Sequence, residues 1–296
     1  MLGFAASQPH QDMRSIKLLF ITNVPQVASF AVEQGVDRIW VDLEIIGKQE
    51  RQGHLDSVIS RHVPADVTRL RPHVPPGALL VRINPVHGGT AAEVDDAIAR
   101  GADILMLPMF TRPDEVDSFC RTVAGRARAC LLVETIGAME SLHECIRVAG
   151  VDEVHIGLND LHLQLGCRFM FEPLASGLVD QMAGILNAAA VPFGIGGVAR
   201  VGEGHLPAQL LLAEHARLGS QAVILSRTFH RQARSVDAIR AQMDFAGEIA
   251  KLRQAFAEHC AASAQTLAAR HREVIAIVAE IVAALPPRRP AGEVRA

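Results

Sequence analysis

The sequence predicts an α/β fold, a (β/α)8 TIM barrel with an additional C-terminal helix. Short apolar runs bounded by polar residues or glycine recur along the chain, and they alternate with segments whose apolar residues have helical spacing. A strand–helix–strand crossover makes its two strands parallel, and eight such units are typical of a barrel. With 296 residues, 49% of them hydrophobic, the chain is long enough to bury a barrel core.

The predicted strands and helices follow one another in regular order. Pro25 opens the first helix where its missing N–H costs little, and Gly35 and Gly101 end two of the helices. Residues 64–77 contain four prolines and predict a turn with a short helix, and a long loop over 167–174 is placed to cover a site. The predicted strands are 16–22, 38–43, 79–83, 104–107, 129–133, 151–156, 192–198 and 222–225. The predicted helices are 25–34, 55–62, 90–100, 113–123, 138–149, 178–190 and 207–218.

The two ends of the chain extend beyond the barrel. We expect a flexible arm over 1–14, the catalytic barrel over 15–250, a helical extension over 251–285 and a disordered tail over 286–296. One face of the extension is apolar and is expected to pack against the barrel or a neighbouring subunit. Its apolar positions are Leu267, Val274, Ile275, Ile277, Val278, Ile281 and Val282.

Composition excludes several classes of function. The net charge is −3 with acids and bases mixed along the chain, and aromatic residues make up 4% with no tyrosine, so nucleic acid is not an expected partner. The five cysteines lack metal-ligand spacing, which is typical of reduced thiols. No secretory leader and no membrane-spanning apolar stretch is evident, so we expect a cytoplasmic protein without a membrane partner.

Two carboxylates stand at the ends of neighbouring predicted strands. Glu134 follows the fifth strand, and Asp160 comes just after the sixth, preceded by Gly157 and Asn159. The carboxyl ends of parallel strands carry the chemistry in α/β folds, and paired carboxylates suit a hard cation such as Mg²⁺ or Mn²⁺. The alternative for each residue is a helix N-cap or half of an ion pair.

Several segments in order resemble one known family. They are VDLE at 41–44, VRIN at 81–84, GADILMLPM at 101–109, LLVET at 131–135 and GVDEVHIGLNDL…LG at 150–166. Together they resemble the HpcH/HpaI aldolase family of the phosphoenolpyruvate/pyruvate barrel superfamily, over roughly residues 16–245. The citrate lyase β-subunit is similar at a greater distance.

The resemblance implies a metal-dependent aldolase that works through a metal-bound pyruvate enolate. It places a divalent cation on Glu134 and Asp160, with Mg²⁺ or Mn²⁺ favoured and Co²⁺ as a further candidate. Pyruvate would chelate this metal, and backbone N–H groups near Leu158 and Asn159 would hold the pyruvate carboxylate.

The resemblance also implies that Arg82 lies beside the keto oxygen of pyruvate, where a fixed guanidinium would stabilise the enolate. The alternative for Arg82 is an ion pair with Glu44 or Asp42 at the barrel rim. Both arrangements are compatible with one another.

One departure from the family pattern concerns the acid/base. The aldolases usually carry Asp-Gly-Glu-His after the second strand, and the citrate-lyase branch carries Asp-Leu-Glu-Asp. Here Glu44 matches both, but Ile45 stands where the histidine or second aspartate is usual and cannot carry a proton. His54 and His87, in loops on the same predicted face, are candidates for that role, with solvated surface histidines as the alternative. His162 is a candidate neighbour of the metal site, or else packs on the next helix.

The acceptor side of the site is expected near the ends of the last two strands, where barrels often bind an anion. The alternative is that the glycines serve tight turns and the arginines pair with rim acids. The residues concerned are Gly196, Gly197, Arg200, Ser226 and Arg227.

We therefore expect a homo-oligomeric enzyme, a trimer or hexamer, that forms or cleaves a 2-oxo acid from pyruvate and an aldehyde acceptor. One alternative is a citrate-lyase-like enzyme acting on an acyl-CoA ester. The other is a barrel that binds a keto acid or a partner without turnover, which the missing histidine suggests.

Overall fold

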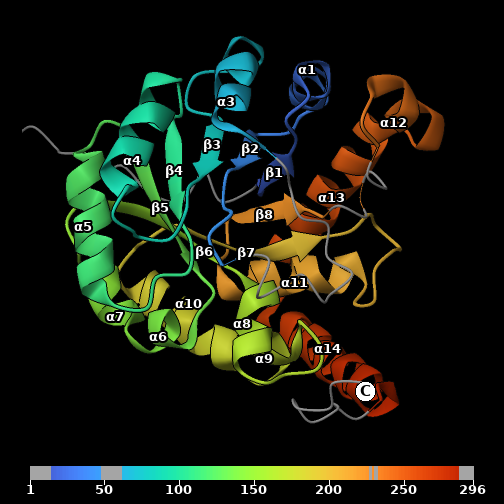
Figure 1. The fold of residues 1–296 in the computed structure, drawn as a ribbon. Helices are drawn as coiled ribbons and strands as arrows, with labels where there is room; N and C mark the ends of the chain where they lie inside the picture. Colours follow the sequence, from blue (N-terminus) through green and yellow to red (C-terminus); the bar gives the residue numbers. More distant parts are fainter. Residues whose placement is uncertain (1–14, 48–61, 227–228, 230–232, 287–296) are drawn as a thin grey trace, which may run out of the picture.

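Eight short strands form the wall of a closed barrel in this computed structural model, which describes residues 15–47, 62–226, 229 and 233–286 (Figure 1). All strands are parallel, neighbours pair in sequence order, and β8 returns to β1. The strands are β1 (Lys17–Ile21), β2 (Arg38–Asp42), β3 (Leu79–Arg82), β4 (Ile104–Leu107), β5 (Arg128–Val133), β6 (Val151–Ile156), β7 (Phe193–Val198) and β8 (Ala222–Leu225). The predicted barrel is confirmed, and each predicted strand end lies within one residue of the observed one.

Helices surround this wall on the outside (Figure 1). The helices between the strands are α1 (Pro25–Glu33), α3 (Pro64–Leu70), a 3-10 turn η1 (Arg71–His73), α4 (Thr90–Ala99), α5 (Pro113–Val123), α6 (Ile136–Glu140), α7 (Leu142–Cys145), α8 (Leu158–Gln164), α9 (Glu172–Ala175), α10 (Leu178–Ala188) and α11 (Ala208–Leu218). After β8 come α12 (Val236–Gln242), α13 (Phe245–Cys260) and α14 (Ala264–Ala284). The helix predicted over 55–62 lies almost entirely outside the described residues, as do the arm over 1–14 and nearly all of the tail.

The segment between β5 and β6 differs from expectation. In place of the single helix predicted over 138–149, two short helices, α6 and α7, are separated at Ser141. The Gly137 carbonyl accepts both the Ser141 N–H at 3.0 Å and the Ser141 hydroxyl at 2.7 Å. Such back-bonding often bends helices, and the apolar periodicity gives no signal for it.

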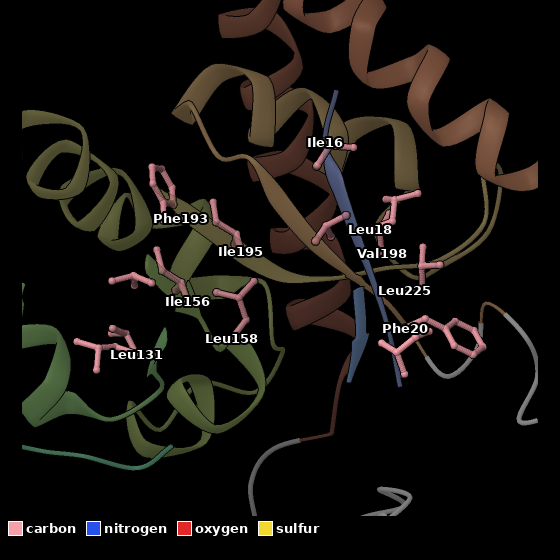
Figure 2. Close-up of a cluster of buried hydrophobic side chains, with 14 of the residues drawn as sticks. Ile16, Leu18, Phe20, Leu131, Ile156, Leu158, Phe193, Ile195, Val198 and Leu225 are labelled. Atoms are coloured by element: carbon pink, nitrogen blue, oxygen red, sulfur yellow. The ribbon is translucent and has the colours of Figure 1, made fainter. Parts of the chain in front are cut away.

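Two apolar cores lie on either side of the strands. The larger one fills the space between strands and helices, and includes Leu18, Phe20, Leu131, Ile156 and Ile195 (Figure 2). The smaller one fills the barrel interior with alternate residues of the same strands: Leu19, Trp40, Leu80, Ile104, Met106, Cys130 and Leu132. Because strand side chains alternate between faces, Asp42, Arg82 and Glu134 continue the inward-facing set at the carboxyl end of the barrel.

The C-terminal helices pack on the barrel's outer layer. α13 runs through residue 250, where the sequence placed the start of the extension, and α14 lies against α11 and α9 (Figure 1). Val274 and Val278 are buried there, as the apolar face predicted, whereas Ile275 is 40% exposed. Among the described helices, none is both long and apolar enough to cross a membrane.

Candidate active site

Four charged side chains lie at or just after the carboxyl ends of β2, β3, β5 and β6. Asp42 ends β2, Arg82 ends β3, Glu134 follows β5, and Asp160 lies in the first turn of α8 after β6. The three carboxylates are buried, with 1%, 3% and 6% of Asp42, Glu134 and Asp160 exposed. Burying a carboxylate is costly unless it is paired or binds a cation. The contacts of these side chains therefore indicate which of them are already paired within the protein.

Arg82 is clamped in place by its neighbours. Its Nε and Nη2 donate to the two Asp42 carboxylate oxygens at 2.8 and 2.9 Å, and Nη2 lies 3.3 Å from Glu44 Oε2. The guanidinium also stacks over the Trp40 ring, 5.2 Å from its centroid. The ion pair at the barrel rim is thus confirmed. It does not exclude the enolate role, since a held guanidinium presents its charge in a fixed position.

The charge on Arg82 is permanent. Burial by itself lowers the pKa of the guanidinium, but the charges of Asp42, Glu44 and Glu134 raise it above its ordinary value. Because Glu134 contributes to this shift, the Arg82 charge lies near the end of β5 as well as its clamp. The rim therefore sets one fixed cation among three carboxylates, and Asp160 adds a fourth.

Glu134 is positioned by two unusual pieces of backbone. The Met109 N–H donates to Glu134 Oε1 at 3.3 Å, and Met109 has a left-handed φ of 54° that few non-glycine residues adopt. On the other side lies Gly157, where a Cβ atom would stand 2.9 Å from Glu134 Cβ and 3.1 Å from Oε2. Only glycine lets β6 pass this close to the carboxylate.

The helix-cap alternative does not account for either carboxylate. Thr135 caps α6, since its hydroxyl accepts the Ala138 N–H at 2.9 Å and donates to the Phe110 carbonyl at 2.6 Å. Gly157 is the N-cap of α8, and Asp160 lies inside the first turn. Neither carboxylate is therefore the N-cap residue of a helix. Because a Cβ at Gly157 would meet the Glu134 side chain, the N-terminus of α8, which carries Asp160, lies beside Glu134.

Hydrogen bonds hold the start of the loop after β2 in place. The N–H groups of Ile45 and Ile46 both donate to Asn84 Oδ1, at 2.9 and 3.0 Å, and Asn84 Nδ2 donates to Glu93 at 2.7 Å. This clamp leaves Ile45 70% exposed. The usual histidine position is thus occupied by an exposed apolar side chain on a hydrogen-bonded backbone.

The candidate histidines differ in their surroundings. His87 is exposed, with Nδ1 at 3.1 Å from both the Pro85 carbonyl and the Thr90 hydroxyl, at the start of α4. His162 is 9% exposed, with Nδ1 3.2 Å from the Leu158 carbonyl of its own helix. His54 and Arg227 lie outside the residues that the structure describes.

The structure brings one further histidine to the rim. The Asp42 backbone N–H donates to His62 Nδ1 at 3.0 Å, so the neutral imidazole carries its proton on Nε2. The sequence placed residue 62 at the end of a helix and offered no signal for this contact. His62 thus holds the backbone of Asp42, whose carboxylate holds Arg82.

The residues expected on the acceptor side have structural partners. Gly196 has a φ of 46°, a Cβ there would stand 3.1 Å from Leu158, and its carbonyl lies 3.1 Å from His155 Nε2. Arg200 pairs with Glu203 at 2.8 Å. Leu158 is buried, while Asn159 is exposed. Close packing and rim pairing thus explain Gly196 and Arg200, and an anion site there stays a prediction.

A divalent cation fits this donor set as a partly open site. No group of three or more histidine, cysteine, aspartate or glutamate side chains is arranged to enclose a metal within the described ranges. Glu134 and Asp160, both buried and both at the mouth, supply two carboxylates. Mg²⁺ and Mn²⁺ commonly take one or two protein carboxylates and leave other positions to water and substrate.

Comparison with known proteins places this geometry in a family. A family model described as HpcH/HpaI aldolase/citrate lyase matches residues 18–172, which include Asp42, Arg82, Glu134 and Asp160. The chain belongs to this family. Membership identifies an HpcH/HpaI-type protein as a lyase in general terms, and no curated protein matches the chain significantly.

Solved structures show the same fold at low sequence identity. An HpcH/HpaI aldolase from Desulfitobacterium hafniense is 17% identical, with a TM-score of 0.57 over 79% of this chain and 95% of that one. An HpcH/HpaI aldolase/citrate lyase family protein from Burkholderia cenocepacia is 15% identical, with a TM-score of 0.56 over 83% and 95%. The citrate synthase SbnG is 14% identical, with a TM-score of 0.56 over 78% and 94%.

Proposed function

We propose that this protein is a metal-dependent aldolase that forms or cleaves the carbon–carbon bond of a 2-oxo acid through the enolate of pyruvate, with an aldehyde as acceptor. The observation that carries the proposal is the fixed guanidinium of Arg82 at the same barrel mouth as two buried carboxylates, Glu134 and Asp160. The family and its similar aldolase structures support a lyase of this kind.

Each residue at the mouth has a role in this chemistry. Glu134 and Asp160 would hold Mg²⁺ or Mn²⁺, which supplies Lewis-acid stabilisation of negative charge on a substrate oxygen. Arg82 stabilises charge on the enolate oxygen, and the clamp by Asp42 and Glu44 means that it need not reorient during the reaction. Loss of a comparable oxyanion donor costs about 3 kcal/mol of barrier, or about 100-fold in rate.

The apolar residue at position 45 means that another group must transfer the proton in this reaction. Ile45 cannot exchange a proton, and the Nδ1 atoms of His62 and His162 already lie at backbone groups. We propose that the metal site and Arg82 stabilise the enolate, and that another group or water removes the proton from the pyruvate methyl group and delivers a proton to the acceptor oxygen. The alternative substrate is an acyl-CoA ester, which becomes the proposal if pyruvate exchanges no methyl protons.

The test is deuterium exchange into the methyl group of pyruvate, followed by proton NMR in D₂O with Mg²⁺ and then with EDTA. We expect the methyl signal of pyruvate to disappear only when the metal is present. The rate of this exchange should fall at least about 100-fold in Glu134→Gln, Asp160→Asn and Arg82→Met. Mn²⁺ binding, followed by electron paramagnetic resonance, separates the roles, because it should weaken in the two carboxylate variants and persist in Arg82→Met.

Glu140→Gln is the matched control, since Glu140 is an exposed glutamate on the same crossover. It should exchange at the wild-type rate. If the wild-type protein exchanges no methyl protons with any divalent metal, the pyruvate proposal is wrong, and cleavage of acyl-CoA esters is the next assay.

A further inference from the structure

A second cavity lies at the opposite, amino-terminal end of the barrel, away from the mouth that holds Arg82. It has a volume of about 360 Å³ and lies where β1 and β8 begin, against α11 and α13. Its lining combines polar and apolar side chains, among them Lys17, Gln221, Ser220, His215, Ala216 and Phe256.

The wall beside Lys17 carries excess positive charge. Arg38 donates to both Glu153 carboxylate oxygens at 2.6 and 3.0 Å, and Arg128 donates to the same carboxylate at 2.8 Å. A narrow cavity of about 20 Å³ brings Lys17 into this group. Three cations therefore face one buried carboxylate.

Nearby acids do not cancel this excess. Asp37 also lines the larger cavity, but it pairs with Arg253 at 2.8 Å and accepts the Leu18 N–H at 2.7 Å. Burial, and then the charge of Arg38, lower the pKa of Lys17. A negative charge placed at the Lys17 ammonium would oppose both effects, because it favours the charged form.

The cavity also presents polar groups that other described residues leave unused. The Lys17 ammonium and the Gln221 side-chain amide make no hydrogen bond within the described part of the chain. His215 is fully buried, its Nδ1 lies 2.8 Å from the Ser220 hydroxyl, and its Nε2 has no partner among the described residues. Burial lowers the pKa of His215 to about 3, so this ring is neutral and adds no charge.

We propose that this amino-end cavity binds a small oxyanion, a carboxylate or phosphate of a metabolite, with the oxyanion between Lys17 and Gln221 and the carbon body against Phe256 and Ala216. The charge excess selects an anion, and the volume limits it to a small molecule. This site is separate from the proposed aldolase site and does not depend on that proposal.

The probes are inorganic phosphate and acetate, each tested against sodium chloride at equal ionic strength by thermal denaturation and isothermal titration calorimetry. A ligand that binds only the native state raises Tm with its concentration. At tenfold excess over Kd, we expect a rise of roughly 3 °C for a chain of this size. The stronger of the two probes identifies the oxyanion class.

Lys17→Met keeps the aliphatic stem but removes the charge, and it should weaken binding at least about tenfold. Lys251→Met is the matched control, because Lys251 pairs with Glu248 on the exposed side of α13. It should bind as the wild type does. Gln221→Leu provides a second variant in case Lys17→Met does not fold, and it should weaken binding in the same direction.

Several results would overturn the proposal. Equal Tm shifts in wild type, Lys17→Met and Gln221→Leu would exclude this cavity, as would the absence of any shift in the wild type. If Arg82→Met abolishes binding while Lys17→Met retains it, the anion binds at the carboxyl-end mouth instead. Because binding is measured without turnover, its failure is distinguishable from failure of the aldolase proposal.

Discussion

Each end of the barrel contains a buried arginine–carboxylate ion pair, but the net charge of the groups around that pair has the opposite sign at the two ends. Both pairs start from β2, whose inward-facing Arg38 binds Glu153 at the amino end and whose Asp42 binds Arg82 at the carboxyl end. Around Arg82 the carboxylates are in excess, whereas around Glu153 the cations are. The carboxyl end is therefore suited to a cation, and the amino end to an anion.

The comparison also separates function from stability. In TIM barrels the carboxyl end carries the reacting groups, while the amino end contributes mainly to stability. The Arg38–Glu153 pair is more deeply enclosed than an ordinary surface pair, with side chains 7% and 8% exposed. Replacing residues at each end should therefore change different measurements.

The largest effect is expected from Glu153→Leu, which leaves Arg38 buried without its carboxylate. Removing one partner of a buried pair costs about 3–5 kcal/mol of the free energy of unfolding, measured by urea denaturation. Asp117→Asn is the control, since its pair with Arg121 on α5 is exposed and worth at most about 1 kcal/mol. Asp42→Asn should cost less than Glu153→Leu, because Glu44 still faces Arg82.

The double variant Arg38→Met with Glu153→Leu sharpens this result. Much of the lost stability should return, since no buried charge is left unpaired. Equal stability of Glu153→Leu and Asp117→Asn would show that the amino-end pair does not differ from a surface pair.

A smaller effect is expected from acid, through the histidine between the two ends. Burial lowers the pKa of His155 to about 4, below the usual value of 6.5. Between these two pH values His155 is protonated in the unfolded chain but not in the folded one. The free energy of unfolding therefore falls as the pH drops from about 6.5 to 4, by about 3 kcal/mol in all.

His155→Gln, which can still donate to the Gly196 carbonyl, should flatten this part of the pH–stability curve. The comparison is made between pH 7 and 4.5 by urea denaturation. His87→Gln is the control, because His87 is exposed at the rim. An unchanged slope in His155→Gln would mean that its ring is not the group that resists protonation.

The smallest effect is expected from Gly157→Ala at the carboxyl end. The added methyl group would meet Glu134 at about the distance of a clash, 2.9 Å from Cβ, and would push the carboxylate aside. Displaced metal-site geometry typically costs about tenfold or more in affinity, which a Mn²⁺ titration by electron paramagnetic resonance measures. In Gly184→Ala, the control, nothing lies within 4 Å of the new atom, so Mn²⁺ affinity should not change.

The positions of the strands were predictable because a buried strand is visible in the sequence as a short apolar run. The apolar runs 104–107 and 222–225 coincide with β4 and β8, because a strand that is enclosed on both faces is usually apolar along its length. Helix ends with proline and glycine signals were equally visible. The break at Ser141 was not, because the apolar spacing of the segment continues across it.

The candidate site was predictable only in part. Glu134, Asp160 and Arg82 stand at strand ends, where order along the chain implies neighbourhood in a barrel. The contact of His62 with Asp42 could not be seen, because it depends on how the chain returns after the loop that follows β2. The roles proposed for His54 and Arg227 remain predictions outside the described residues.

By itself, the sequence determined the barrel, the order of its strands and the two carboxylates at its mouth, since periodicity and parallel crossovers are local properties. The tertiary structure alone decided which charges meet. Arg38 and Glu153 are 115 residues apart, and Lys17 on β1 and Arg128 on β5 join them. Closing the sheet brings β1 beside β8, and only closure turns scattered charges into two ends of opposite character.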